Sequence, residues 1–219
     1  MKLWERWRPL TGLLSALGMI VGTLFVLDQP QDTDSNTKIV SYFAQHSHRV
    51  EGVVGFFVFL AGVLLLLAFL ATLRDRLAAA EGGHGGLAAL AYGGGVASAA
   101  VWIVAMLLAR ATSFAVTETS KFHVDPNTYR MLGDTAYWGW VSATALAALV
   151  VWGTSAVALR TGVLPRWFGR VGIVVGVVQL FGIFFFPFFA WWIWLALASV
   201  LLVARPRLAT AARGVAPAQ

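Results

Sequence analysis

Long apolar stretches separated by polar segments dominate the chain. The first four run approximately over residues 9–27, 50–73, 87–109 and 135–159. A helix needs about 20 apolar residues to cross a hydrocarbon core of roughly 30 Å, and each stretch approaches that length. The pattern therefore predicts four membrane-spanning helices.

The remaining apolar block, residues 171–204, contains no charged side chain and is too long for a single span. Pro187 stands near its middle among several phenylalanines. Proline lacks a backbone donor and clashes with the preceding helical turn. We therefore expect two short helices, 171–186 and 188–204, which meet at an aromatic-rich turn near the membrane interface. The alternative is one long kinked helix and five spans in total.

Together these stretches predict an all-α fold, a polytopic transmembrane helical bundle of about six spans. Residues 1–204 form a single transmembrane domain in this interpretation, and residues 205–219 form a disordered cytoplasmic tail. The first stretch follows a basic start but lacks a small-x-small cleavage site. We therefore expect a retained span and not a cleaved signal peptide.

The charges predict how the bundle is oriented. The chain is 59% hydrophobic and 12% charged, and a typical soluble domain has roughly 25% charged residues. With the N-terminus inside, most basic residues fall on the cytoplasmic side and most acidic residues fall outside, as the positive-inside rule requires. Both termini are then cytoplasmic. The net charge of +6 reflects topology and not nucleic-acid binding, and we expect lipids of a bacterial plasma membrane as partners.

Two predicted outer loops carry a similar short signature, Asp34-Ser-Asn-Thr37 and Asp125-Pro-Asn-Thr128. Aspartate accepts hydrogen bonds from the first amides of a helix, and proline suits the first helical position. Each loop is therefore expected to end in a helix that runs into the next span. The match also suggests a weak internal duplication, as in many transporters, although chance and shared capping explain it more simply.

Polar residues inside spans usually point to function, because burying a charge in lipid is costly. No charged or histidine side chain lies well inside any predicted span, and Gln179 is the only amide at depth. A hydrogen bond to Ser142, Thr144 or Thr154 is the favoured role for Gln179, and contact with a ligand is the alternative. The lack of intramembrane charge argues against a proton-coupled pump or a voltage sensor.

Glycines recur at helix-packing spacing, at Gly18 and Gly22 in the first span and at Gly172 and Gly176 in the fifth. Such pairs let helix backbones approach closely. Packing within the bundle accounts for them, although they also permit a homo-oligomer or another membrane-protein partner.

The outer side gathers His46, His48 and His123 with several acidic residues. Three imidazoles can bind zinc and activate a water molecule. However, His46 and His48 lie two apart in a segment predicted to be helical, where such residues face different directions. A solvated polar loop is the simpler interpretation. The sequence has no HExxH, nucleophilic-serine or phosphate-binding motif and no cysteine, and we expect no cofactor.

The inner loop between the fourth and fifth spans has the most distinctive sequence. Trp167 and Phe168 can lie at the level of the lipid headgroups, while Arg160, Arg166 and Arg170 contact anionic lipid. We expect an interfacial anchor, with a partner-docking loop as the alternative.

This loop, residues 161–170 with the sequence Thr-Gly-Val-Leu-Pro-Arg-Trp-Phe-Gly-Arg, resembles uncharacterised multi-pass membrane proteins common in actinobacteria. The opening Trp-Arg-Pro-Leu-Thr-Gly at residues 7–12 and the segment Ile-Val-Ser-Tyr-Phe at residues 39–43 are similar to the same family. The resemblance covers most of the chain through short motifs. It implies a six-span fold and, because the family is a domain of unknown function, no site residues.

The sequence favours a non-enzymatic protein that binds a lipid or a small apolar molecule, or that serves as a subunit of a membrane complex. This hypothesis is supported by the lack of charged side chains within the predicted spans, by the small residues at helix-packing positions and by the lack of catalytic motifs. A small carrier or channel is the first alternative, motivated by the repeated signature. A metal-dependent enzyme with an outer-face site is the second.

Overall fold

The computed structural model of the chain describes residues 7–83, 85–119, 121–184 and 186–204. Within them, helices are joined by turns and short loops, without a strand. In chain order the helices are η1 (Arg8–Leu10), α2 (Thr11–Leu27), α3 (Asn36–Ala44), α4 (His46–Ala80), α5 (Gly86–Glu118), α6 (Pro126–Thr161), α7 (Arg166–Gln179) and α8 (Phe186–Ala204). The predicted all-α fold is confirmed, and the tail predicted for residues 205–219 lies outside the described residues.

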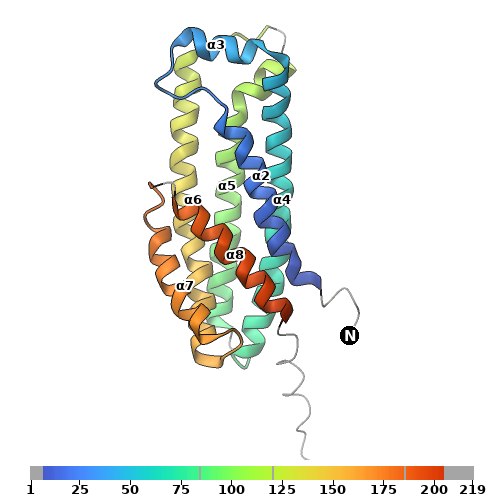
Figure 1. Cartoon of the computed structure of the whole chain (residues 1–219), viewed down its shortest axis with the longest axis vertical. Helices are drawn as coiled ribbons and strands as arrows, with labels where there is room; N and C mark the ends of the chain where they lie inside the picture. Colours follow the sequence, from blue (N-terminus) through green and yellow to red (C-terminus); the bar gives the residue numbers. More distant parts are fainter. Residues whose placement is uncertain (1–6, 84, 120, 185, 205–219) are drawn as a thin grey trace, which may run out of the picture.

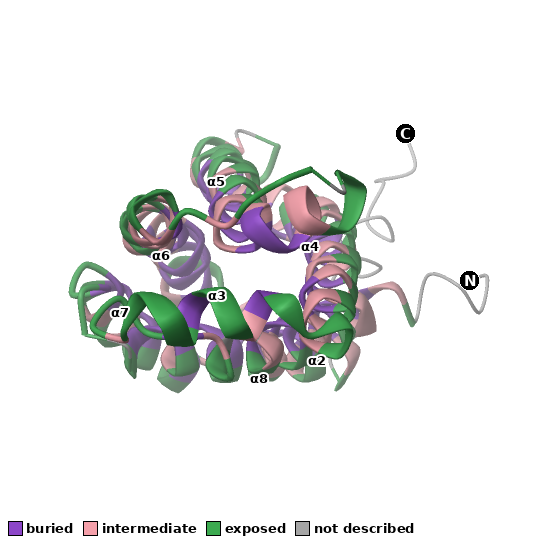
Figure 2. Cartoon of the chain, turned by 90° about the horizontal axis from the view of Figure 1, so that it is seen from above, coloured by how far each residue is buried: buried purple, intermediate pink, exposed green. Residues whose placement is uncertain are grey.

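The bundle is a closed ring of helices, which Figure 2 shows from above; its members are α2, α4, α5, α6, α7 and α8. Around this ring α2 packs on α4, α4 on α5, α5 on α6, α6 on α7, α7 on α8, and α8 on α2. The ring is uneven in height, because α4, α5 and α6 have 35, 33 and 36 residues whereas α7 has 14 and α8 has 19. At 1.5 Å per residue the three long helices extend about 50 Å and α7 about 21 Å.

The short helices α7 and α8 therefore accompany only one end of the bundle (Figure 1). We name this end the inner half. The opposite end, which α3 crosses, is the outer half (Figure 1). The inner half has walls from all six helices of the ring, whereas the outer half depends on α4, α5, α6, the end of α2, and α3 with the segment before it.

Five helices are long and apolar enough to cross a membrane, namely η1 with α2, then α4, α5, α6 and α8. Their outward faces also suit lipid, because Leu17, Leu64 and Ile193 are more than half exposed. At 14 residues, α7 is shorter than a typical span of about 20. These helices are consistent with a helical membrane bundle, and the number of six spans stays a prediction.

The last apolar block contains two helices, as predicted, but the break precedes the expected position. Helix α7 begins at Arg166 and ends at Gln179, residues 180–184 form the connection, and α8 begins at Phe186. Pro187 therefore does not form the turn. It stands in the first turn of α8, where its missing amide hydrogen costs no helical bond.

Aromatic side chains fill the interior of the inner half. The ring centroid of Trp191 in α8 lies 5.6 Å from that of Trp102 in α5 and 5.8 Å from that of Trp194. Phe168 of α7 stacks on Trp194 at 5.5 Å. All four side chains are buried, so this aromatic column ties α5, α7 and α8 together at typical ring-packing distances.

The glycine pair of the first span brings α2 close to α4. A Cβ on Gly18 would lie 3.0 Å from the Cα of Gly62, and a Cβ on Gly22 would lie 2.7 Å from a backbone nitrogen of α4. A side chain at either position would therefore force the helices apart. Gly172 and Gly176 face α6 at similarly short distances, which confirms that both pairs serve packing within the bundle.

The described chain begins and ends in the inner half (Figure 1). The Ser199 hydroxyl of α8 donates to the Pro9 carbonyl and accepts a hydrogen bond from the Leu13 amide at 3.1 Å. The two ends are thus joined directly. This arrangement agrees with termini on one side of the membrane, and the cytoplasmic identity of that side stays a prediction.

Both aspartate signatures begin helices, but only the second helix continues into a span. Ser35 caps α3 and Asp125 caps α6, each by accepting hydrogen bonds from amides of the first turn. Helix α3 ends at Ala44, and the extended backbone of Gln45 separates it from α4. The expectation that the first helix runs into the next span is therefore wrong, because α3 lies across the outer end instead (Figure 2).

Candidate functional site

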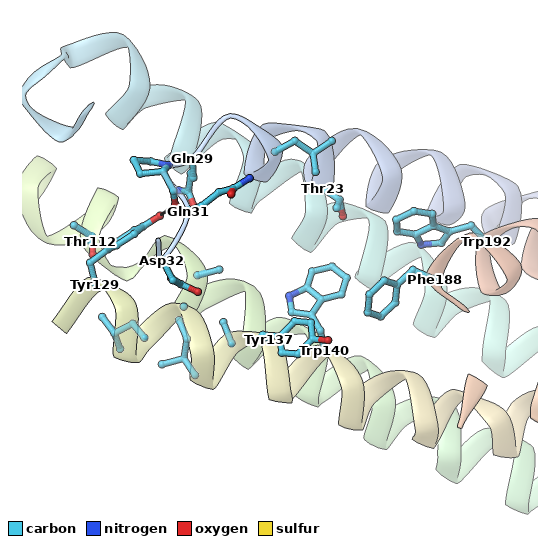
Figure 3. Close-up of a pocket in the computed structure, with 17 residues that line it drawn as sticks. Thr23, Gln29, Gln31, Asp32, Thr112, Tyr129, Tyr137, Trp140, Phe188 and Trp192 are labelled. Carbon is cyan, nitrogen blue, oxygen red and sulfur yellow. Dashed lines mark hydrogen bonds between the residues drawn. The ribbon is translucent and has the colours of Figure 1, made fainter. Parts of the chain in front are cut away.

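A cavity of about 340 Å³ lies in the outer half between α2, α5, α6 and the start of α8 (Figure 3). The segment that follows α2 covers it on one side, through residues 29–32. Because α7 and α8 are short, they do not fill this space, and the side chains of the longer helices enclose it. The cavity is thus a consequence of unequal helix lengths in the ring.

The two ends of the cavity differ in chemistry (Figure 3). Trp140, Phe188 and Trp192 form the inner end, and the Trp140 and Phe188 rings meet edge to face with centroids 5.4 Å apart. Gln29 and Asp32 lie at the outer end, on the covering segment. This gradient suits a molecule with an apolar body and one polar group.

Two neighbouring residues of α6 hold the covering segment in place. The Tyr129 hydroxyl donates to the Pro30 carbonyl at 2.6 Å. Arg130 donates through Nε to the Asp32 carbonyl and through Nη2 to the Asp34 carbonyl, each at 2.8 Å. Three backbone carbonyls of an otherwise irregular segment are thereby satisfied, which fixes the wall of the cavity.

Tyr129 also joins α3 to the bundle. It forms a small buried cluster with Ile39 and Phe43 of α3, and its ring centroid lies 5.4 Å from that of Phe43. The same residue lines the cavity. Tyr129 is therefore the point at which the cavity wall, the covering segment and α3 meet.

Asp32 is the one carboxylate among the described residues that line the cavity, and none of those residues is basic. Partial burial raises the pKa of the Asp32 carboxyl, and Asp134 raises it further through its charge and a shared hydrogen bond. Arg130 opposes these effects only in part. The polar end of the cavity therefore holds a proton more readily than an aspartate in open solution does.

A second polar feature, away from the cavity lining, lies between α4 and α5. Arg110 is completely buried, and none of its three side-chain nitrogens has a hydrogen-bond partner among the described residues. Ser113, one helical turn further, is equally buried and its hydroxyl also has none. The sequence placed Arg110 in the outer loop and no charge within a span. The loop position is wrong, because α5 continues to Glu118, and the lack of charge well inside a span stays a prediction.

The described part of the chain has no group of three or more histidine or acidic side chains arranged to hold a metal ion. His46 and His123 are exposed. His48 stacks on Tyr42 with ring centroids 4.1 Å apart, and its Nδ1 lies 3.2 Å from Oε2 of Glu51. Zinc binding by the three histidines stays a prediction.

Gln179 ends α7 and is completely buried. Its amide oxygen and nitrogen both lack a hydrogen-bond partner among the described residues, so the bond expected with α6 is wrong. Thr144 donates to the Trp140 carbonyl instead, and the Thr154 hydroxyl is itself without a partner in the described chain. Gln179 does not line the cavity, and a ligand contact there stays a prediction.

The inner loop exposes Arg160, Arg166, Trp167 and Arg170, as an interfacial anchor requires. Contact of these side chains with lipid stays a prediction. Phe168 differs, because it is completely buried in the aromatic column. Its expected position among the lipid headgroups is therefore wrong.

The cavity residues were not identified from the sequence. Most are ordinary apolar, aromatic or amide side chains contributed by four helices and a loop, and the relative heights of the helices bring them together. The one local sign is the Asp125 capping signature, which places Tyr129 and Arg130 in the first turns of α6.

Five helices are long and apolar enough to cross a membrane and have large apolar side chains on their outward faces, which is typical of a helical membrane protein. No family model, curated protein or solved structure matches it. The function is therefore argued from the cavity and from the chemistry of the residues around it.

Proposed function

We propose that this protein binds a small apolar or amphiphilic molecule, such as a lipid or a fatty alcohol, in the cavity of the outer half. The observation that carries the proposal is the cavity itself, with its volume of about 340 Å³, its aromatic inner end and its polar outer end. Ligand pockets typically measure about 300–1,000 Å³ and are mostly apolar with a few polar groups. The cavity falls within that description.

Access from the membrane supports this proposal. Leu27 and Tyr137 line the cavity and are also exposed, by 63% and 37%. The Tyr137 hydroxyl donates to the Ile183 carbonyl at 2.6 Å, which places the connection between α7 and α8 beside this opening. Because neighbouring helix faces are apolar, a molecule dissolved in the lipid would reach the cavity without passing through water.

The energetics favour an alkyl chain at the inner end. For a molecule that enters from lipid, the favourable contribution is close packing of its alkyl chain against the aromatic rings of the inner end. At the outer end, a hydroxyl or a similar polar group can exchange hydrogen bonds with the Asp32 carboxyl and the Gln29 amide. The Nε2 of Gln29 is buried and has no partner within the described residues.

Binding is favoured over transport because of the inner half. The buried side chains of Trp102, Trp191 and Trp194 lie there and pack against one another. A carrier would need to open this column to connect the cavity with the other side. The proposal is accordingly a binding protein, or a lipid-binding subunit of a membrane complex, without an enzymatic step.

The setting in the membrane is part of the same proposal. We place the protein in a bacterial plasma membrane with six spans, α7 being the shortest, and with the inner half towards the cytoplasm. The exposed Arg160, Arg166 and Arg170 support this orientation. Membership of the actinobacterial family is proposed on the inner-loop motif, the opening at residues 7–12 and the segment at residues 39–43.

The experiment is thermal unfolding of the purified protein in a nonionic detergent, with and without decanol. Decanol should raise the unfolding midpoint of the wild-type protein. Ala136→Leu fills the cavity from α6, because Ala136 is buried and lines it, and should abolish the rise. Ala100→Leu adds the same side chain to an exposed position on α5 and should retain it. An absent wild-type shift, or equal shifts in both variants, would refute the proposal.

A further inference from the structure

Arg110 is a buried charged side chain whose hydrogen-bonding groups are all unsatisfied within the described chain. It is 0% exposed, and Nε, Nη1 and Nη2 all lack a hydrogen-bond partner among the described residues. It precedes the end of α5 by eight residues, or about 12 Å along the helix axis. A guanidinium carries five N–H donors and keeps its charge at any ordinary pH, so a full positive charge lies in the interior near the outer end of the bundle.

A buried charge normally has a partner. Removing an ion from water is costly, and buried charges in proteins are paired, hydrogen-bonded or bound to an ion. Among the described residues, the ion pairs that form are Lys38 with Asp34 and His48 with Glu51, and neither includes Arg110.

The second unpartnered group is the hydroxyl of Ser113, on the same side of α5. A Cβ on Gly52 of α4 would collide with the Ser113 Oγ and would lie 3.9 Å from Nη1 of Arg110. A Cβ on Gly55 would lie 3.3 Å from Nη2. The two glycines therefore let both donor groups lie directly against α4, and both groups lie within 4 Å of the Cβ position of Gly52.

We infer that Arg110 and Ser113 form a binding site for an oxyanion, either a free phosphate or the phosphate of a lipid headgroup. A planar guanidinium matches the geometry of two oxygens on one anion and forms strong charge-assisted hydrogen bonds with them. The serine hydroxyl donates to the same anion. Bound there, the anion neutralises the charge that the protein leaves uncompensated.

This site is separate from the cavity. The residues of α5 that line the cavity are Leu108, Ala109 and Thr112, and Arg110 and Ser113 lie outside that lining. The inference therefore does not depend on binding of an apolar molecule. A cavity-filling substitution and a substitution of Arg110 should act on different ligands.

The test measures the unfolding midpoint of the purified protein in a nonionic detergent against three additions at constant ionic strength, balanced with potassium chloride. The additions are inorganic phosphate, a short-chain phosphatidylglycerol, and an alkyl glucoside of similar chain length as the uncharged control. The wild-type midpoint should rise by several degrees with the concentration of a phosphate-containing addition. If both phosphate-containing additions raise the midpoint, a free phosphate is sufficient as the ligand. If only the phospholipid raises it, the ligand is the phosphate of a lipid headgroup.

Arg110→Met should abolish these rises, and it should not lower the midpoint in phosphate-free buffer, because it removes an unpaired buried charge. Ser113→Ala should leave the phosphate-free midpoint unchanged, because the hydroxyl has no partner in the described chain. It should weaken the phosphate response about tenfold, as expected for the loss of one hydrogen bond to a charged group. Lys121→Met removes an exposed outer cation and should leave the response unchanged.

If Arg110→Met does not fold, Ser113→Ala and Lys121→Met alone decide the matter. The inference is overturned if neither phosphate nor the phospholipid raises the wild-type midpoint. It is equally overturned if Ser113→Ala responds with wild-type affinity, or if Arg110→Met responds as the wild type does.

Discussion

The inner and outer halves of the bundle are built from the same three long helices but differ in what completes them. In the inner half, α2, α7 and α8 close the ring, and buried indole rings fill its centre. In the outer half, α7 and all but the start of α8 are missing, and a hydrogen-bonded segment with α3 takes their place. The inner half is filled by packed aromatic rings, and the outer half contains a cavity and a buried arginine without a hydrogen-bond partner among the described residues.

This difference indicates that the inner half mainly stabilises the bundle and that the outer half binds ligands. Close-packed interiors lose stability when volume is removed, whereas a cavity marks a place where another molecule can supply contacts. We therefore expect substitutions in the inner half to change global stability. Substitutions in the outer half should change local opening and the response to ligands.

The largest effect is expected from Trp191→Ala in the aromatic column. The side chain is 1% exposed, and truncating a buried aromatic residue typically lowers the free energy of unfolding by about 3–5 kcal/mol. Unfolding in mixed micelles with increasing sodium dodecyl sulfate measures this quantity. Trp138→Ala is the matched control, because Trp138 is 57% exposed on α6 and should change little. Equal losses in the two variants would contradict a packed inner half.

Tyr129→Ala should open the outer half without unfolding the inner half. It removes the ring that contacts Phe43 and the hydroxyl bonded to Pro30, so the free energy of opening α3 should fall by about 2–4 kcal/mol. Tyr129→Phe removes only the hydrogen bond and should cost about 1 kcal/mol. Amide hydrogen exchange of α3 and of α8 measures the two halves separately. Faster exchange throughout α8 would count against their independence.

Arg130→Ala should loosen only the covering segment. Two hydrogen bonds to the Asp32 and Asp34 carbonyls are lost, which corresponds to about 1–2 kcal/mol. Exchange of the amides in residues 31–35 should accelerate while the global unfolding midpoint stays nearly constant. Lys121→Ala, at another outer position, serves as the control. Unchanged amide exchange in Arg130→Ala would show that the hydrogen bonds from Arg130 to the Asp32 and Asp34 carbonyls do not hold the segment.

The smallest effect concerns the protonation of Asp32. Because its native pKa is raised above 3.8, the folded state binds this proton more tightly than the unfolded state, and stability falls as pH rises through the native pKa. Asp32→Asn should therefore have a higher unfolding midpoint than the wild type at neutral pH. The difference should vanish below pH 3.8. A constant difference at every pH would mean that charge is not its cause.

The pKa of Asp34, in the same segment, is shifted in the opposite direction from that of Asp32. Its hydrogen bonds with Lys38 and the Gln31 amide lower its pKa, so ionised Asp34 stabilises the fold above pH 3.8, and this stabilisation is lost as pH falls through the native pKa. Asp34→Asn should consequently have a slightly lower midpoint at neutral pH. Thermal unfolding across the acidic range measures both variants together, and shifts of equal sign would contradict the assignment.

The sequence predicted the helices well because apolar stretches of membrane length leave few alternatives. The glycine pair at Gly18 and Gly22 and the capping residue Asp125 were also identifiable, since each acts through neighbours within a turn or through close backbone approach. The break near Pro187 was placed several residues too late. Proline is tolerated in the first turn of a helix, so its presence marks a helix boundary without fixing the side on which the chain turns.

The candidate site could not be predicted in the same way. Arg110 was taken as the first residue of a loop because it follows an apolar run, whereas α5 continues to Glu118 and buries it. The cavity depends on where α7 and α8 end relative to α6, which is a property of three-dimensional packing. The zinc site was predicted only from the ability of histidine side chains to bind metal. In the structure His48 contacts Tyr42 and Glu51.

Binding of an apolar molecule in the outer half is the central claim, and native mass spectrometry of the intact protein with decanol tests it most directly. The wild-type protein and the Ala100→Leu variant should each retain one decanol molecule after release from the detergent micelle. Ala136→Leu should retain none at the same concentration. Equal occupancy of Ala136→Leu and the wild type, or no bound decanol on any of the three proteins, would contradict the account.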